Sequence, residues 1–139
     1  MQDWVEVMQR VNDATYAAWN AHDAAAVAAV FAEDARVRDS SVADWEIGRA
    51  AVQARAQRLM DAFPDLRLER QALVINGPHH ADGWILPGTH AGASFGMAPT
   101  GNPIRIEGAT FTTRNDQGEV IEDVHHVDYA TLFRQLGVT

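Results

Sequence analysis

The densest run of potentially reactive side chains lies near the end of the chain, in the segment VIEDVHHVD at residues 120–128. Its β-branched residues favour a strand, in which successive side chains point to opposite faces. One face would carry Ile121, Asp123, His125 and Val127. The other would carry Glu122, Val124, His126 and Asp128. An acid and a histidine that share a cavity suit enolisation, in which one group removes a proton and the other donates one to oxygen.

Electrostatics gives a further expectation for this pair. A carboxylate beside an imidazole orients the ring and stabilises its protonated form, so we expect Asp123 to raise the pKa of His125. The alternative for both residues is a solvated hairpin or a dimer interface.

The preceding segment must hold this strand in place. Asn115–Gly118 is a turn signal between two runs of period-two alternation, which predicts a hairpin over residues 104–129. Antiparallel pairing would set Gly108, Thr110 and Thr112 beside Asp123 and His125.

The rest of the chain divides by the spacing of its apolar residues. Helical spacing predicts helices over residues 4–18, 23–31, 49–62 and 131–136. Period two predicts strands over residues 35–39, 66–75 and 84–90, with a bulge between Leu68 and Leu73. Gly77–Gly83, which contains His79 and His80, reads as a turn, and residues 96–103 as a loop. Helices followed by a long antiparallel sheet favour an α+β fold, and a bent sheet wrapped over helices leaves a conical pocket. We expect residues 1–139 to form one domain.

Composition narrows the class of protein. The chain has 139 residues and a net charge of −8, so nucleic acid is not an expected partner. No apolar run is long enough to cross a membrane, and the first residues do not resemble a signal peptide, so we expect a cytoplasmic protein. There is no cysteine, which excludes thiol nucleophiles and disulfides.

Cofactors are not expected. Two adjacent histidine pairs occur, His79–His80 and His125–His126. On a strand, the two side chains of each pair would point to opposite faces, and neither pair has a third ligand at standard spacing, so no metal site is predicted. The glycine-rich patterns that cradle nucleotide phosphates are missing.

Several stretches resemble the SnoaL-like polyketide cyclases of the nuclear-transport-factor-like superfamily. They are WNAHDAAAVAAVFAEDARVRD, FPDLRLE, GTHAGASFGMAPTGN and RNDQGEVIEDVHHVDYATLFRQLG. The resemblance implies a cone-shaped α+β barrel, with three N-terminal helices packed in a strongly curved antiparallel sheet. It also implies that Asp123 and His125 face the pocket, and that two copies pair through their convex faces. That face would include Val120, Glu122, Val124 and His126.

The resemblance suggests three further site residues. Asp39 stands where the related ketosteroid isomerases hold their general base; its alternative is a strand-end acid paired with Arg36 or Arg38. His90, in GTHAG, lies on a strand that carries a histidine in the family and would be an acid or donor; its alternative is a structural role. Thr110 takes the place of the isomerases' oxyanion-stabilising acid and can donate a hydrogen bond only.

Flat aromatic walls would suit a planar, polycyclic or polyketide-like substrate. The candidate wall residues are Tyr16, Trp19, Trp45, Trp84 and Phe95. Their alternative is the hydrophobic core, to which we assign Trp4.

The leading hypothesis is a cofactor-free acid–base enzyme that performs an intramolecular aldol cyclisation or isomerisation. Asp123 with His125 would be the acid/base pair, Asp39 the rival base, and His90 a donor to the oxyanion. A second hypothesis is epoxide opening by two of Asp39, Asp65 and Asp123. A third is a ligand-binding module without catalysis.

Overall fold

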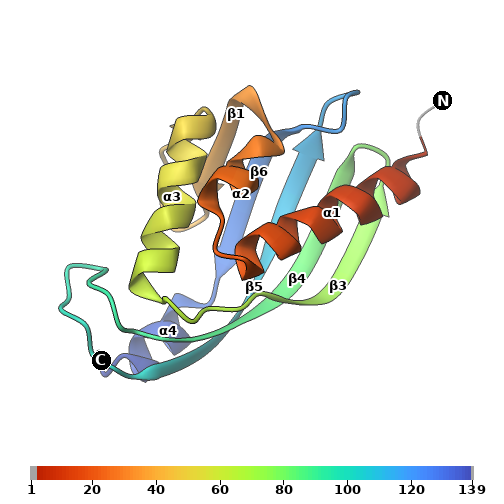
Figure 1. Ribbon diagram of the computed structural model, residues 1–139. Helices are drawn as coiled ribbons and strands as arrows, with labels where there is room; N and C mark the ends of the chain where they lie inside the picture. Colours follow the sequence, from red (N-terminus) through yellow and green to blue (C-terminus); the bar gives the residue numbers. More distant parts are fainter. Residues whose placement is uncertain (1–2, 139) are drawn as a thin grey trace.

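The computed structural model describes residues 3–138 and places four helices on a six-stranded sheet (Figure 1). The helices are α1 (Trp4–Asn20), α2 (Ala24–Ala29), α3 (Arg49–Ala62) and α4 (Tyr129–Gln135). The strands are β1 (Phe31–Asp39), β2 (Glu46–Ile47), β3 (Glu69–Asn76), β4 (His79–Thr89), β5 (Pro103–Arg114) and β6 (Val120–Val127).

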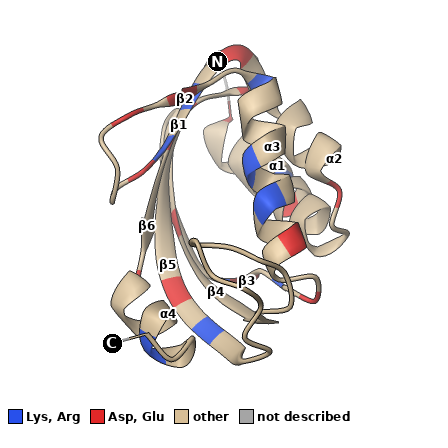
Figure 2. Cartoon of the chain, turned by 90° about the vertical axis from the view of Figure 1, so that its left-hand side faces the viewer, with Lys and Arg blue, Asp and Glu red and all other residues tan. Residues whose placement is uncertain are grey.

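The sheet curves strongly, and α1, α2 and α3 cover its concave face (Figure 2). This is the α+β cone expected from the sequence. Two details differ from expectation. The strand order β2-β1-β6-β5-β4-β3 leaves the sheet open, with β2 and β3 at its edges. The sheet is also mixed, because β1 pairs with β6 in parallel whereas the other neighbouring strands pair antiparallel.

Aspartates set the starts of three helices. Asp3, Asp23 and Asp128 each accept a backbone N–H one turn into α1, α2 and α4, which satisfies a donor that the helix itself leaves unpaired. The cap at Asp128 starts α4 at Tyr129, two residues before the predicted start. The second helix ends at Ala29 rather than Phe31, because the chain enters β1 there and buries the Phe31 side chain.

The predicted turn at Gly77–Gly83 is too long. Only Gly77 and Pro78 form the turn, and His79 and His80 already belong to β4, where they pair with Asn76 and Ile75. His80 is buried against α1 rather than exposed on a loop. The register shift between Arg70 and Ala72 confirms the bulge expected in the preceding strand.

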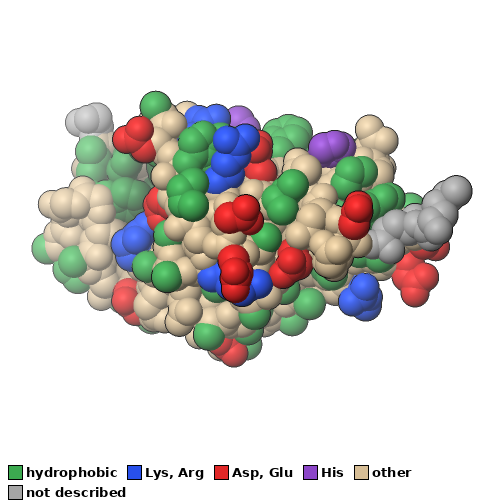
Figure 3. Space-filling view, turned by 90° about the horizontal axis from the view of Figure 1, so that it is seen from above, with side chains coloured by type: hydrophobic (Ala, Val, Ile, Leu, Met, Phe, Trp, Pro, Cys, Tyr) green, Lys and Arg blue, Asp and Glu red, His purple; other side chains and the backbone are tan. Residues whose placement is uncertain are grey.

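The core lies between α3, α4 and the middle of the sheet. Its larger cluster packs Met60 of α3 and Phe63, which follows this helix, against Leu86, Ile106 and Leu132. Of the helices within residues 3–138, none has the length and apolarity to cross a bilayer. Acidic and basic side chains are interspersed on the face shown in Figure 3, so that face offers no continuous basic surface to a polyanion.

The loop between β4 and β5 is fixed to the end of α3. The N–H groups of Ala91 and Gly92 both donate to the carbonyl of Ala62, at 3.1 and 3.0 Å. A Cβ atom at Gly92 would stand 1.9 Å from the Asp61 carbonyl oxygen, so only glycine fits this contact without a backbone shift.

Gly92→Ala should therefore lower the free energy of unfolding by about 2 kcal/mol, as overpacking against backbone does. Urea unfolding measures this. Gly83→Ala is the matched control, because a Cβ there would stand 3.9 Å from Ala72 Cβ, an ordinary contact. Equal stability of the two variants would show that the loop yields freely at Gly92.

Candidate active site

A cavity of about 130 Å³ opens between α1, α3 and the concave face of the sheet. Its wall is mainly apolar, and one group of polar side chains comes from three neighbouring strands. These are His80 and Asp82 from β4, Thr110, Thr112 and Arg114 from β5, and Asp123 and His125 from β6. Few, convergent polar groups in an apolar hollow are typical of a small-molecule site.

Strand β6 presents the expected pair to this cavity. Asp123, His125 and Val127 lie opposite Thr112, Thr110 and Gly108, as the hairpin predicted. Ile121 does not belong to this face. Thr113 pairs with Glu122 and Arg114 pairs with Val120, so Ile121 is an extra residue in β6. This bulge turns Ile121 outward, at 37% exposure, and turns Val120 inward, at 2%.

Asp123 is the central acid of the cavity. Its side chain is buried, and the hydroxyl of Thr112 donates to Oδ1 at 2.5 Å. Burial raises the pKa of Asp123 to about 7, against the opposing effects of the Thr112 hydrogen bond and the Arg114 charge. The nearby Asp82 contributes to this rise. An acid with such a pKa can both take and return a proton near neutrality.

His125 is held by a short chain of donors. The indole of Trp84 donates to Thr110 Oγ1 at 3.0 Å, and we assign the hydroxyl proton of Thr110 to His125 Nδ1 at 2.8 Å. The neutral ring then carries its proton on Nε2, which lies 3.8 Å from Asp123 Oδ2.

The expected rise in the pKa of His125 is wrong. Burial lowers this pKa well below its usual value, and the charges of Arg55 and His126 lower it further. The carboxyl of Asp123 cannot offset this loss of hydration, because it too is buried and holds its proton up to about pH 7.

A second acid, Asp82, was not predicted as a site residue. The hydroxyl of Tyr16 donates to Asp82 Oδ2, and His80 Nε2 lies 3.5 Å from Oδ1. Burial and the contact with Asp82 raise the pKa of Tyr16. The signal in the sequence is the alternation His80, Asp82, Trp84, which continues the strand through the segment that was read as a turn.

Asp39 lies at the end of β1 but is not part of the cavity wall among the described residues. Tyr129 donates to its Oδ2, the Ser41 N–H donates to Oδ1 at 2.9 Å, and Arg55 lies 3.8 Å away. Burial alone would raise the pKa of Asp39, but these contacts outweigh it and the pKa is lowered. Its basic partner is Arg55, rather than Arg36 or Arg38.

His90 also lies away from the cavity wall. Its Nδ1 accepts from the Thr100 N–H at 3.1 Å, which leaves Nε2 to donate to Ser94 Oγ at 2.9 Å. Both ring nitrogens are therefore used to fold the loop between β4 and β5. This geometry fits the structural role that the sequence left open.

Four of the five candidate aromatic residues line the cavity: Tyr16, Trp19, Trp84 and Phe95. The ring of Trp84 lies across Gly108, where a Cβ would stand 2.3 Å from it. The fifth, Trp45, instead packs beneath the guanidinium groups of Arg36 and Arg38, at 4.3 and 5.0 Å.

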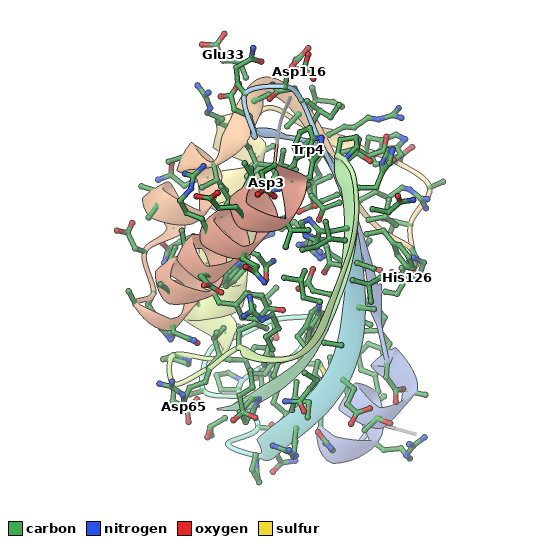
Figure 4. All side chains as sticks on the ribbon, turned by 90° about the vertical axis from the view of Figure 1, so that its right-hand side faces the viewer. Asp3, Trp4, Glu33, Asp65, Asp116 and His126 are labelled. Atoms are coloured by element: carbon green, nitrogen blue, oxygen red, sulfur yellow. The ribbon has the colours of Figure 1, made fainter. Side chains whose placement is uncertain are left out.

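Asp65 serves the fold at one end of the molecule (Figure 4). It accepts from the N–H and hydroxyl of Thr89 at 2.7 and 2.8 Å, and the hydroxyl bond is the main reason that its pKa is lowered.

Within residues 3–138, no three histidine, aspartate or glutamate side chains converge as metal ligands would.

The sequence matches the model of the SnoaL-like polyketide cyclase family over residues 9–136. The chain belongs to this family. Among curated protein sequences, none matches this SnoaL-like protein significantly.

Solved structures share the fold at low sequence identity. TsrD from Streptomyces laurentii is 21% identical, with a TM-score of 0.86, over 100% of this chain and 99% of its own. IdmH from Streptomyces antibioticus, a candidate polyketide cyclase, is 24% identical, with a TM-score of 0.77, over 99% and 100%. SalBIII, an epoxide hydrolase/cyclase-like enzyme in pyran ring formation of salinomycin, is 20% identical, with a TM-score of 0.78, over 94% and 97%.

The raised pKa of Asp123 predicts a pH-dependent stability difference between the SnoaL-like protein and its Asp123→Asn variant. Between the unfolded value of 3.8 and about 7, the unfolded chain has lost the proton that the folded chain retains. The contribution of protonated Asp123 to the free energy of unfolding is therefore fully present below pH 4 and is lost as the pH rises to about 7. Asp123→Asn removes this loss and keeps an acceptor for Thr112. Its melting temperature should exceed that of wild type at pH 8, and the difference should shrink toward pH 4.

Glu122→Gln is the control, since this side chain pairs with Arg36 on the exposed face. It should follow the wild-type pH profile. A melting difference for Asp123→Asn that stays constant from pH 4 to 8 would show that Asp123 ionises in the folded state as it does in the unfolded one.

Proposed function

We propose that this SnoaL-like protein is a cofactor-independent acid–base enzyme that acts on a polyketide-like carbonyl compound, by intramolecular aldol cyclisation or the related isomerisation. The observation that carries the proposal is the Asp123 carboxyl, which is 6% exposed, lies in the cavity wall and has a pKa near 7. His125 beside it supplies a neutral N–H donor.

The reaction needs two proton transfers and one new carbon–carbon bond. Ionised Asp123 takes a proton from the carbon next to a carbonyl, and the C–H electron pair forms an enolate. The Nε2–H of His125 donates to the enolate oxygen. The enolate carbon then attacks a second carbonyl carbon of the same molecule, whose π electrons move to its oxygen. Protonated Asp123 returns the proton to that alkoxide, which completes the aldol product.

The surrounding residues support this reaction by fixing geometry. The chain from Trp84 through Thr110 holds the imidazole in one tautomer, so its donor is in place before the negative charge develops. The aromatic and aliphatic wall would fold a flexible polyketide so that its two reacting carbons meet, which removes part of the entropic cost of ring closure.

Epoxide opening is a second candidate function, and the presence of Asp82 favours it. Asp82 and Asp123 line one cavity, whereas Asp39 and Asp65 do not, so the pair to consider differs from the pairs suggested by the sequence. One carboxylate would activate water or an internal hydroxyl, and the other acid would protonate the epoxide oxygen. The similarity of fold to SalBIII is in keeping with this chemistry.

Variants of the two faces of β6 test the proposal. The assay uses a soluble triketone whose intramolecular aldol step closes a second six-membered ring. Asp123→Asn should lower kcat roughly 10²- to 10⁴-fold with little change in KM, because the shape is kept and the base is lost. His125→Ala should also lower kcat. The double variant should be little worse than the worse single variant, since the two residues act as one unit.

Glu122→Gln is the matched control, one residue away on the outer face, and should keep wild-type kcat. If Glu122→Gln were inactive and Asp123→Asn active, the assignment of the catalytic face would be wrong.

A separate assay with styrene oxide in water labelled with heavy oxygen tests the second function. A labelled diol product that is lost in the Asp82→Asn variant would favour epoxide opening.

We also propose that two copies pair through the convex face of the sheet. Val74, Ala81, Phe111 and Val124 form a row across β3, β4, β5 and β6, and Val74 and Phe111 are exposed. His126 lies beside Phe111 on the side of the sheet away from the helices (Figure 4). Val120, which was expected on this face, faces the core instead because of the bulge at Ile121.

Light scattering of the wild-type protein at micromolar concentration should return the mass of a dimer. The Phe111→Glu variant should return the mass of a monomer, because pairing would bury the new charge in an apolar interface. Ile47→Glu, at an exposed apolar position on the edge strand β2, is the control. A monomer mass for the wild-type protein would contradict the proposed pairing.

A further inference from the structure

One buried group of the cavity has been given no contact with the substrate in the proposed reaction. Arg114, at the end of β5, is 4% exposed and lines the cavity. Its Nη1 donates to the carbonyl of Gly118 at 2.9 Å, which ties the guanidinium to the turn before β6. Its Nε has no hydrogen-bond partner among the described residues. A buried donor without an acceptor is costly, so an unpaired N–H of this kind calls for an explanation.

The acids near Arg114 stabilise its charge only from a distance. Burial lowers its pKa, and the carboxyl groups of Asp123 and Asp82 raise it through their charge, although neither is hydrogen-bonded to the guanidinium. The Thr112 hydroxyl donates to Oδ1 of Asp123, and the Tyr16 hydroxyl donates to Oδ2 of Asp82. The acids that could have paired with the guanidinium therefore accept from other donors, and the guanidinium has no carboxylate partner of its own.

We propose that Arg114 forms a subsite for a carbonyl oxygen of the ligand, to which the guanidinium group donates where it lines the cavity. The ligand class is a ketone or a dicarbonyl compound rather than a carboxylate. A second negative charge would meet Asp82 and Asp123, whereas a neutral oxygen meets only the donor. The inference deepens the proposed function, because it rests on the same cavity and adds an anchor for a carbonyl near the reacting one.

Anchoring here would also matter during the reaction. A carbonyl held by a buried cation becomes more polarised as negative charge develops on it, and the low local dielectric strengthens this effect. The subsite therefore suits a dicarbonyl unit with one oxygen at Arg114 and the other facing His125.

Binding of unreactive probes tests the subsite separately from catalysis. The cavity of about 130 Å³ is close to the volume that takes one benzene ring. Acetophenone, ethylbenzene and benzoate therefore serve as a carbonyl probe, its apolar counterpart and an anionic counterpart. Quenching of tryptophan fluorescence reports binding, since Trp19 and Trp84 line the cavity.

Arg114→Met should weaken acetophenone binding roughly 10- to 100-fold, the range for loss of a hydrogen bond to a charged group. It should leave ethylbenzene binding unchanged or tighter. In the wild-type protein, benzoate should bind more weakly than acetophenone. Arg55→Met is the matched control, because Arg55 also lines the cavity but lies beside Asp39. It should keep the wild-type ratio of the acetophenone and ethylbenzene dissociation constants.

This ratio does not depend on the folded fraction, so a partly unfolded Arg114→Met sample remains informative. Arg114→Gln, whose shorter amide carries no charge but can still donate to the turn, serves if Arg114→Met does not fold, and should shift the ratio in the same direction because the charged donor is lost. An unchanged ratio in either variant, or a wild-type protein that prefers benzoate or binds no acetophenone, overturns the subsite. Asp123→Asn should keep the ratio, so a protein without cyclase activity can still confirm the subsite, and an active enzyme can still lack it.

Discussion

The energetic cost of removing a carboxyl group from water is the constraint on which the rest of this site depends. Asp123 is buried, so its neutral form is favoured and its pKa rises to about 7. Without compensation, an acid in such a wall would simply stay protonated. The Thr112 hydroxyl and the more distant charge of Arg114 stabilise the ionised form enough to bring the two forms close in energy. Both partners come from β5, so the pairing of β5 with β6 sets the ionisation of Asp123 as well as the fold.

Curvature and strand order together provide that burial. β6 lies between β1 and β5, three strands from the β3 edge, and its concave face is covered by helices (Figure 2). Gly108 lets the Trp84 ring lie flat across β5, where its indole N–H reaches Thr110. The sheet therefore places a donor chain behind His125 using only neighbouring strands, and such a chain needs no loop to order before a ligand binds.

The sequence predicted what depends on local pattern and missed what depends on distant contacts. The turn at Asn115–Gly118 and the alternation after it placed Asp123 and His125 opposite Thr112 and Thr110. The outward position of Ile121 follows from a bulge, and no residue type in VIED marks one. Asp82 was missed because Gly77, Pro78 and Gly83 together resemble a long turn, while the chain uses only Gly77 and Pro78. The surroundings of Asp39 depend on Tyr129, 90 positions away, which local reasoning cannot supply.

The contrast between Asp39 and Asp123 shows why position on a strand does not decide which acid is reactive. Both are buried, and burial raises the pKa of each. Asp39 accepts from Tyr129 and from the Ser41 backbone and lies near Arg55, so its ionised form is strongly stabilised and it is a weak base. Asp123 has one hydrogen bond and a more distant cation, and Asp82 nearby disfavours its ionisation. A base is effective when its pKa lies near the working pH, so the less stabilised of these two carboxylates is the better suited to move a proton.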